Sequence, residues 1–454
     1  MQLTDVLYSL GWQTIRPLLA VAGLFSPRLA RAIAGRKYAA SAMRAWAEAE
    51  ARAGTGAGAS AGGPLVWLHG ASAGELAGVA PVVEELRRLV PGLRLAVTYS
   101  SPSGETAAAR LAPAYAGYVP LDLRAHTDEA LAALKPAALV YAKLDVWPNL
   151  TASAKRAGVP VGLVNATVRP GSGRLRQPGR VLLRRAYEAL DAVGAVSAAD
   201  VSRLEVLWVR ADAVRLTGDA AFDQALARLR ATEGRPLYLP ARPPGVVRLI
   251  AGSTWAEDEA FLVEAVADLP SVELVLVPHE PTAAAVRRIR DRTEARLKSE
   301  LRLYSELRAG PGARGADTAG AGDGPPEPSE APPPLVVDAV GFLAELYAEG
   351  DVAYVGGGLA GTGLHSVVEP AAAGLPVLFG PRHDRREARE LVEAGGALEV
   401  DPPGMHAALT ELLDAERRRA MGAAARAYVE AHAGAGRAGA ELVRELLADG
   451  PESA

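Results

Sequence analysis

Cysteine is absent from the 454 residues of this chain. The absence excludes disulfides, a thiolate nucleophile and any cysteine-ligated metal or iron–sulfur site. Histidine is scarce as well, with seven residues and no pair at the H-x-x-x-H spacing, so a zinc site built on histidine is not expected. We therefore expect no bound metal.

A large excess of charge of either sign is also missing. The chain has 49 Lys and Arg against 53 Asp and Glu, a net charge of −4, which gives no reason to expect a nucleic-acid partner. Hydrophobic residues make up 49% and charged residues 22%, the balance of a globular protein. The length predicts two or three domains, each able to bury its own core.

The amino terminus departs from this charge balance. Residues 1–46 contain six basic residues and one acid, Asp5, and an uncharged run extends from Leu18 to Phe25. The run is too short for a transmembrane helix, which needs about 20 apolar residues, and the basic flanks do not follow the order of a secretory signal. A membrane-surface anchor and an amphipathic helix packed on the domain both fit. Anionic headgroups attract basic flanks, so we predict a membrane-association segment over residues 1–50.

From Pro64 onward, short apolar runs alternate with helical patterns, which predicts parallel sheets with helices on both faces. The expected strands of the first half are Leu65–Leu68, Leu95–Tyr99, Tyr118–Pro120, Ala138–Tyr141, Val161–Val164, Ala192–Val196 and Val214–Thr217. The rhythm restarts at Val246, and the second half is expected to contain strands at Arg248–Ala251, Glu273–Val277, Leu335–Val337, Val352–Val355, Pro376–Phe379 and Ala397–Val400.

This pattern predicts two α/β domains in tandem, over residues 64–225 and 246–425, joined by a proline-containing linker at 226–245. Residues 308–334 are rich in Gly, Pro and Ala without periodicity, so they are expected to be a disordered insertion without a catalytic role. A C-terminal helix over residues 426–454 is long enough to cross back to the first domain.

Gly70-Ala71-Ser72-Ala73-Gly74 has the G-x-S-x-G pattern of a nucleophile elbow and lies between an expected strand and helix. Ser72 could thus be a hydrolase nucleophile. The preceding strand is the first of the sheet, however, and no upstream unit supplies the second oxyanion donor. The alternative is a glycine-rich turn at a helix start, where amides favour an anion or a carboxylate. Glu75 follows directly, either as a helix-dipole partner or as a general base at the edge of the sheet.

A second glycine-rich loop, Gly356–Gly363, follows an expected strand, and Glu369 lies early in the next helix. The loop lacks a P-loop lysine and fits the dinucleotide fingerprint poorly. Amides at a helix start suit a phosphate, and a glutamate suits two ribose hydroxyls, whereas a tight turn with a capping glutamate is the structural alternative.

Several segments of the sequence resemble the motifs of a known family. Trp67-Leu68-His69-Gly70-Ala71-Ser72-Ala73-Gly74-Glu75 is similar to the HGAS-x-GE motif of the 3-deoxy-D-manno-octulosonic acid (Kdo) transferases. Further similar segments follow in the family's order: Thr98-Tyr99-Ser100-Ser101, Val146-Trp147-Pro148-Asn149-Leu150, Leu163-Val164-Asn165-Ala166, Thr217-Gly218-Asp219, Gly252-Ser253-Thr254 and the block from Gly356 to Pro381. The series spans about residues 65–400, and its order is far more specific than any single motif.

The resemblance implies a GT-B fold, in which two Rossmann-like domains with parallel sheets face a central cleft. It implies inverting transfer of Kdo from CMP-Kdo to a lipid A precursor (lipid IVA) in lipopolysaccharide biosynthesis, without a metal or other cofactor. Glu75 takes the place of the family's proton acceptor, and Ser72, Gly74, Ser101 and Asp145 lie on the acceptor side. Donor contacts fall on Ser253, Thr254, Pro278, His279, Val340, Gly341, Phe342, Gly357, Gly358, Ser366, Val367, Val368 and Glu369. The implied location is the cytoplasmic face of the bacterial inner membrane, on an anionic membrane surface.

The sequence departs from the common family pattern at three places: Lys143-Leu144-Asp145, Pro278-His279-Glu280-Pro281 and Gly363-Leu364-His365-Ser366. These changes bear on the donor contact at His279 and on acceptor choice near Asp145. Lys143 can pair with Asp145 or with a phosphate of the acceptor. The alternatives are a transferase for another CMP-activated acidic sugar or lipid acceptor, the Ser72 hydrolase and a non-catalytic nucleotide-binding module.

Overall fold

A computed structural model describes residues 24–53, 63–235, 238–309, 332–359 and 363–448, with residues 8, 11, 12, 21, 22 and 361. The chain forms two compact units, Met1–Gln224 with Ala433–Ala454, and Ala225–His432. The division falls inside helix α10 (Ala220–Arg230), so the linker expected at 226–245 begins within a helix. Most of the disordered insertion expected at 308–334, and most of residues 1–23, lie outside the described residues.

The first unit is built on a seven-stranded sheet in the order β3-β2-β1-β4-β5-β6-β7, with every pair parallel. The strands are β1 (Leu65–His69), β2 (Arg94–Tyr99), β3 (Tyr115–Tyr118), β4 (Ala138–Ala142), β5 (Val161–Ala166), β6 (Ala192–Ala195) and β7 (Val214–Leu216). The helices are α2 (Pro27–Arg52), α3 (Ala73–Gly78), α4 (Ala80–Leu89), α5 (Gly104–Arg110), α6 (Arg124–Leu134), α7 (Pro148–Arg156), α8 (Gly179–Glu188), α9 (Ala198–Val206) and α19 (Ala435–Ala448).

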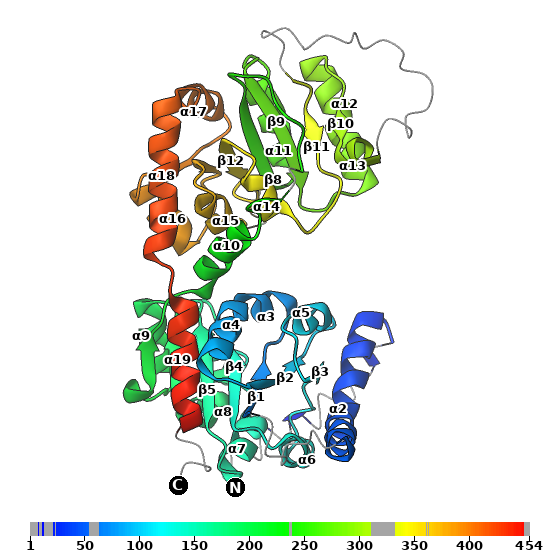
Figure 1. Cartoon of the computed structure of the whole chain (residues 1–454), viewed down its shortest axis with the longest axis vertical. Coiled ribbons are helices and arrows are strands. Elements are labelled where there is room, and N and C mark those ends of the chain that lie inside the picture. Colours follow the sequence, from blue (N-terminus) through cyan, green and yellow to red (C-terminus); the bar gives the residue numbers. More distant parts are fainter. Residues whose placement is uncertain are drawn as a thin grey trace. The chain divides into compact units, whose positions relative to one another are not determined.

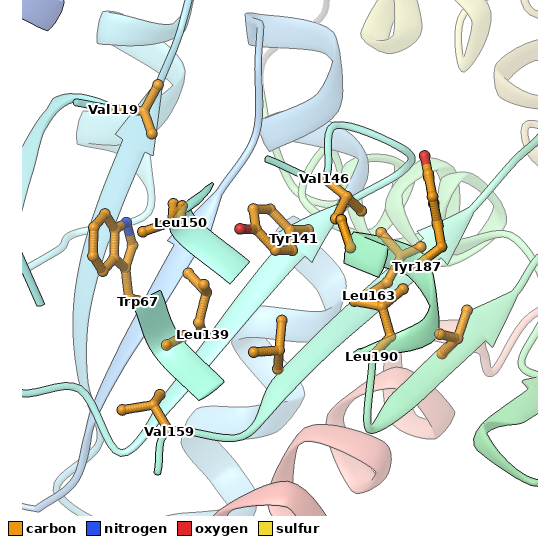
Figure 2. Close-up of a cluster of buried hydrophobic side chains, with 14 of the residues drawn as sticks. Trp67, Val119, Leu139, Tyr141, Val146, Leu150, Val159, Leu163, Tyr187 and Leu190 are labelled. Carbon is orange, nitrogen blue, oxygen red and sulfur yellow. The ribbon is translucent and has the colours of Figure 1, made fainter. Parts of the chain in front are cut away.

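Alternate residues of the central strands pack on opposite faces of this sheet. Trp67, Leu139 and Tyr141 belong to one buried cluster, shown in Figure 2, whereas Val66 and Val140 belong to a second cluster. Successive side chains of a strand point to opposite faces, so two clusters require helices on both sides. This explains why β1 and β4 are buried along their whole length and read as continuous apolar runs.

The second unit repeats the arrangement with a sheet in the order β10-β11-β9-β8-β12-β13-β14, again parallel throughout. Its strands are β8 (Val247–Thr254), β9 (Val272–Pro278), β10 (Arg302–Leu303), β11 (Leu335–Val336), β12 (Val352–Val355), β13 (Val377–Phe379) and β14 (Ala397–Glu399). Besides α10, its helices are α11 (Ala256–Val266), α12 (Ala283–Leu297), α13 (Tyr304–Ala309), α14 (Leu343–Tyr347), α15 (Val368–Ala372), α16 (Arg386–Glu393), α17 (Met405–Glu411) and α18 (Ala415–Ala431).

The prediction of α/β architecture with parallel sheets is confirmed, and two strands differ from expectation. The strand expected at Tyr118–Pro120 is β3, which lies earlier and ends at Tyr118. Its register pairs Tyr115 with Ala96 and Tyr118 with Tyr99. Pro120 has no N–H for a sheet ladder, so it belongs after the strand and not within it. Strand β10 was not expected, because two residues carry no periodicity.

Helix α2 packs on the first unit through its small residues. Ala39, Ala40 and Met43 are buried, and Gly35 lies so close to Tyr118 that a Cβ there would be 2.2 Å from the ring. Among the described residues, no helix has both the length and the apolar character required to cross a bilayer.

Helix α19 returns the end of the chain to the first unit, where it lies beside α4 (Figure 1) and also contacts β4, β5 and β6. The helical conformation is interrupted between α18 and α19 at Gly434, whose φ is +108°. The carboxylate of Asp223 accepts hydrogen bonds from the N–H groups of Gly434 (2.9 Å) and Gly436 (3.2 Å), which fixes the start of the returning helix.

Candidate functional site

Each sheet has one point at which neighbouring strands send their connections in opposite directions. In the first sheet it lies between β1 and β4, and in the second between β8 and β12. Ligands of open parallel sheets bind at the carboxyl ends of such strands, where the diverging loops leave a crevice. The loops after these four strands carry most of the residues singled out from the sequence.

Glu75 lies at the first of these points, in the first turn of the short helix α3 after β1. Its Oε2 accepts a hydrogen bond from the N–H of Ala71 at 2.6 Å, so the carboxylate turns back over the loop that precedes it. The same loop binds the loop after β2, because the N–H of Ser101 donates to the carbonyl of Ala71 at 2.8 Å. The structure therefore brings Ser101 to the loop that holds Glu75.

Asp145 reaches the same region from the loop after β4. Its Oδ2 lies 3.1 Å from Nε2 of the fully buried His69 and accepts from Nε1 of Trp147 at 3.2 Å. Arg174 donates to Oδ1 at 3.4 Å. The other ring nitrogen of His69 lies 3.1 Å from the carbonyl and 3.0 Å from the hydroxyl of Thr98.

The two carboxylates have pKa values displaced in opposite directions. Burial raises the pKa of Glu75, and the charge of Asp145 adds to this, against the Ala71 hydrogen bond and the charges of Lys143 and His69. Burial would also raise the pKa of Asp145, but the hydrogen bond and charge of His69, then the charge of Arg174, bring it below its usual value. A carboxyl with a raised pKa beside one with a lowered pKa is an arrangement typical of acid–base sites.

Ser72 and Gly74 lie at the start of α3. Ser72 is the residue before α3, with an extended backbone and no capping hydrogen bond from its side chain. Both ring nitrogens of His69, the histidine of the same motif, contact groups other than Ser72. A serine nucleophile needs a histidine within hydrogen-bond reach as its base, so this geometry does not favour the hydrolase.

Lys143 lies in the loop after β4 with a positive φ of 57°. Its side chain runs toward α3, because a Cβ at Gly78 would lie 3.8 Å from the Cε of Lys143. Asn165, at the end of β5, also has a positive φ of 55°, and its Oδ1 accepts from the N–H of Ala220 at 3.2 Å. Sequence reasoning had placed Asn165 in a motif without giving it a role.

In the second unit, Asp258 holds the glycine-rich loop after β12 against the end of β8. Its buried carboxylate accepts from the N–H groups of Trp255 (2.9 Å) and Gly357 (3.1 Å) and from the hydroxyl of Tyr354 (2.6 Å). Gly356 packs on Ser253 so closely that a Cβ would lie 2.3 Å from the carbonyl oxygen of Ser253. Only glycine allows this approach.

The donor contacts expected at Thr254, His279 and Gly357 come together at this edge of the sheet. The N–H of His279, just after Pro278, donates to the carbonyl of Thr254 at 3.0 Å. The His279 ring stacks on Trp255, with centroids 4.7 Å apart, and lies 4.6 Å from the ring of His365. The carbonyl of Gly358, the next residue of the loop, accepts from the N–H of Arg382 at 2.8 Å.

The other expected donor contacts form a second group, held by Arg228 of α10. This residue donates to Glu369 at 2.7 Å and to Glu345 at 3.3 Å. Glu369 follows Ser366, Val367 and Val368 at the start of α15, and Glu345 follows Val340, Gly341 and Phe342 at the start of α14. Arg228 therefore joins both segments, and no motif in the sequence indicated it.

Glu369 has neighbouring charges of both signs, from Arg228 and Glu345. Burial raises its pKa, and the charge of Arg228 lowers it while that of Glu345 raises it. Nearby, Val340 is 74% exposed, and the Phe342 ring stacks on Tyr238 at 5.1 Å. Glu369 is partly buried, with 28% of its side chain exposed.

Comparison with known proteins identifies the family. Residues 45–224 match the family model of 3-deoxy-D-manno-octulosonic-acid transferase (kdotransferase). The transferase of that name from Bordetella pertussis is 31% identical over 402 residues, which cover 84% of this chain and 87% of the relative. The chain belongs to the 3-deoxy-D-manno-octulosonic acid transferase family.

A Chlamydia trachomatis transferase of the same name is 25% identical over 81% of each chain. Among solved structures, the UDP-GlcNAc 2-epimerase from Neisseria meningitidis matches with a TM-score of 0.57 at 15% identity, covering 84% of this chain and 99% of that chain. That likeness shows the fold alone, and it confirms the GT-B type of two parallel-sheet domains. The protein is thus a glycosyltransferase of the Kdo transferase family.

Proposed function

We propose that this protein transfers Kdo from CMP-Kdo to the lipid A precursor lipid IVA, with inversion, in lipopolysaccharide biosynthesis. The observation that carries the proposal is Glu75: a half-buried carboxylate with a raised pKa, oriented by a backbone N–H at the ligand-binding edge of the first sheet. A carboxylate in that state suits a general base at neutral pH. Membership of the family supplies the reaction class.

The proposed step is a single displacement. A hydroxyl oxygen of the acceptor forms a bond to the anomeric carbon of Kdo while the bond from that carbon to the CMP phosphate oxygen breaks. The hydroxyl proton passes to Glu75, and CMP leaves with the electron pair. Because Ala71 holds Oε2, Oε1 is the oxygen that meets the acceptor hydroxyl. Attack opposite the leaving group inverts the configuration.

His69 and Asp145 position the loop in this proposal and do not exchange the proton. Their side chains are committed to each other, to Thr98 and to Trp147. The lowered pKa of Asp145 keeps a negative charge beside Glu75 at neutral pH, which raises the proton affinity of the base.

On the donor side, we propose that Glu369 accepts hydrogen bonds from ribose hydroxyls, with Arg228 holding its Oε1. The N–H of Gly357 is already bonded to Asp258, so the amide of Gly358 would receive the charge that develops on the leaving phosphate. Among the described residues, no group of three His, Asp or Glu side chains could hold a metal ion. The proposal assigns no step to a metal, and a chelator arm tests this directly.

The test is an assay with CMP-Kdo and lipid IVA, read by mass spectrometry. Glu75→Gln keeps the shape and removes the base, so the transfer rate should fall about a hundredfold or more, while CMP binding persists. Glu105→Gln is the matched control, since Glu105 pairs with Arg31 in an exposed position on α5. An excess of EDTA should leave the wild-type rate unchanged.

Three outcomes would contradict parts of the proposal. Near-normal transfer by Glu75→Gln would refute the base. Loss of activity with EDTA that is restored by a divalent ion would refute metal independence. Failure of the wild-type protein to transfer any Kdo would refute the donor or the acceptor. The product mass also gives the number of Kdo units added.

We also propose that the protein works on an anionic membrane surface. Leu24 and Phe25, just before α2, expose 79% and 85% of their surface. Arg28 follows within α2. Exposed apolar residues beside basic ones are the composition of an interfacial contact. Arg31 and Arg44, in contrast, form ion pairs with Glu105 and Glu129 within the unit.

A further inference from the structure

Three polar side-chain atoms at the carboxyl edge of the second sheet are buried and have no hydrogen-bond partner within the described part of the chain. They are Oγ1 of Thr254, Nε1 of Trp255 and Nε2 of His365. Buried polar groups in native proteins are almost always paired, and an unpaired one needs an explanation such as a bound molecule. Three such atoms in one place point to a ligand.

The three atoms belong to one local structure. Thr254 and Trp255 are consecutive at the end of β8, and His279 from the end of β9 stacks on the Trp255 ring. The ring of His279 also lies next to the ring of His365, with centroids 4.6 Å apart. Its backbone N–H donates to the carbonyl of Gly356 at 3.2 Å, which ties the segment to the glycine-rich loop.

The chemistry of these atoms selects the kind of ligand. Indole Nε1–H can only donate a hydrogen bond, and a hydroxyl can donate as well. Burial, with the charges of His279 and Arg385, lowers the pKa of His365 to about 4, so its ring is neutral at pH 7. A neutral imidazole still carries one N–H. The set therefore fits a group that offers acceptor oxygens.

The surroundings favour a negative charge on that group. The guanidinium of Arg385 carries a positive charge that acts on His365. Asp258, a carboxylate at this edge, is occupied by the N–H groups of Trp255 and Gly357 and by the hydroxyl of Tyr354. Neutral donors in a positive field bind an oxyanion without the larger desolvation cost of a buried ion pair.

We propose that Thr254, Trp255 and His365 form an oxyanion subsite of the donor-binding face, which takes the phosphate or the sugar carboxylate of the nucleotide sugar. This rests on the proposed function, because it assumes that a CMP-activated acidic sugar binds here. Trp255 and His365 then help to determine which donor the protein binds, in addition to the contacts that the sequence indicated.

The test uses substitutions that remove one donor and keep the shape: Thr254→Val, Trp255→Phe and His365→Leu in the full-length protein. Trp208→Phe and His406→Leu are matched controls, since Trp208 contacts Arg180 in the first unit and His406 bonds the carbonyl of Ala265. Binding of CMP, cytidine and CMP-Kdo is measured by calorimetry. Thermal unfolding of each variant confirms that it is folded.

The loss of one hydrogen bond to a charged acceptor should weaken binding about tenfold or more. If the subsite takes the phosphate, the variants lose affinity for CMP and CMP-Kdo but not for cytidine. If it takes the carboxylate, they lose affinity for CMP-Kdo alone. Unchanged affinity for all three ligands, or an equal loss for cytidine, would overturn the subsite.

The result also separates this inference from the proposed function. A wild-type protein that binds CMP-Kdo, with variants that bind it equally well, refutes the subsite and leaves the donor intact. A wild-type protein that binds neither CMP nor CMP-Kdo refutes the donor itself, and with it the subsite.

Discussion

Glu75 is held between charges of opposite sign, and this decides how well it can act as a base. Burial and Asp145 raise its pKa, while Lys143 and His69 lower it. The sequence placed Glu75 and Asp145 in separate motifs 70 positions apart in the chain. Their interaction exists because β1 and β4 are neighbours in the sheet, with His69 aligned to Tyr141.

Lys143→Gln should move the acidic limb of the rate–pH profile to higher pH. The base acts when ionised, so kcat/KM falls as pH drops through the pKa of Glu75. The positive charge of Lys143 lowers this pKa, so its removal raises the pKa further. The pH profile of kcat/KM, extended to acid until the limb is complete, measures this shift.

Lys155→Gln serves as the control for this substitution, because Lys155, on α7, pairs with Asp191. A limb that stays in place, or moves to lower pH, would contradict the electrostatic role of Lys143. A higher KM for the acceptor with an unmoved limb would assign Lys143 to an acceptor phosphate instead, which is the alternative that the sequence left open.

At the scale of elements, the last helix of the chain completes the first core. Leu442, Val443 and Leu446 of α19 are buried with residues of α4 and the sheet. The fit is close, because a Cβ at Gly162 of β5 would lie 2.5 Å from Cδ1 of Leu446. The sequence predicted a C-terminal helix over residues 426–454 that could cross back to the first domain, but it does not show the interruption at Gly434 or which face of the sheet the helix covers.

Leu446→Ala should destabilise the first unit by about 2–5 kcal/mol, the usual cost of a cavity left by a buried leucine. The residue is 4% exposed. Chemical denaturation with hydrogen-exchange protection of β4 and β5 measures the effect and assigns it to the first unit. Arg444→Ala, on the exposed side of the same helix, should change stability by less than about 0.5 kcal/mol. Equal effects of the two substitutions would contradict the packing of α19.

At the scale of the whole molecule, the chain uses one sheet topology twice. In both units the connections between strands change direction beside the first strand of the sheet. The candidate site residues lie on the loops at that point. Glu75 and Asp145 mark it in the first unit, and Trp255 and Gly357 mark it in the second. The repeat was readable from the βαβ rhythm, because each buried parallel strand leaves a continuous apolar run.

Membrane association belongs to the same scale, since it concerns the surface of the whole protein. Leu24→Ser with Phe25→Ser should reduce binding to vesicles that contain anionic phospholipid, because both side chains are exposed and free to enter the headgroup region. The unfolding temperature should not change. Sedimentation with vesicles measures the bound fraction, and Leu216→Ser, which removes another exposed leucine of the first unit, is the control. Equal binding of the variant and the wild-type protein would refute this contact.

The sequence by itself determined the architecture and the family, and it predicted Glu75 as the base. Apolar periodicity is local, so it showed the strands and helices of both domains, and the ordered motifs identified the family and Glu75. It misplaced β3, because it gave no register, and it did not show β10.

Only the tertiary structure decided the contacts between residues distant in the chain. Arg228 joins Glu345 and Glu369, Asp258 holds the glycine-rich loop, and His365 completes the stack on His279. The physical reason is that hydrogen bonding and burial depend on which strands become neighbours. A linear pattern of side chains records the period of each strand, but not its partner.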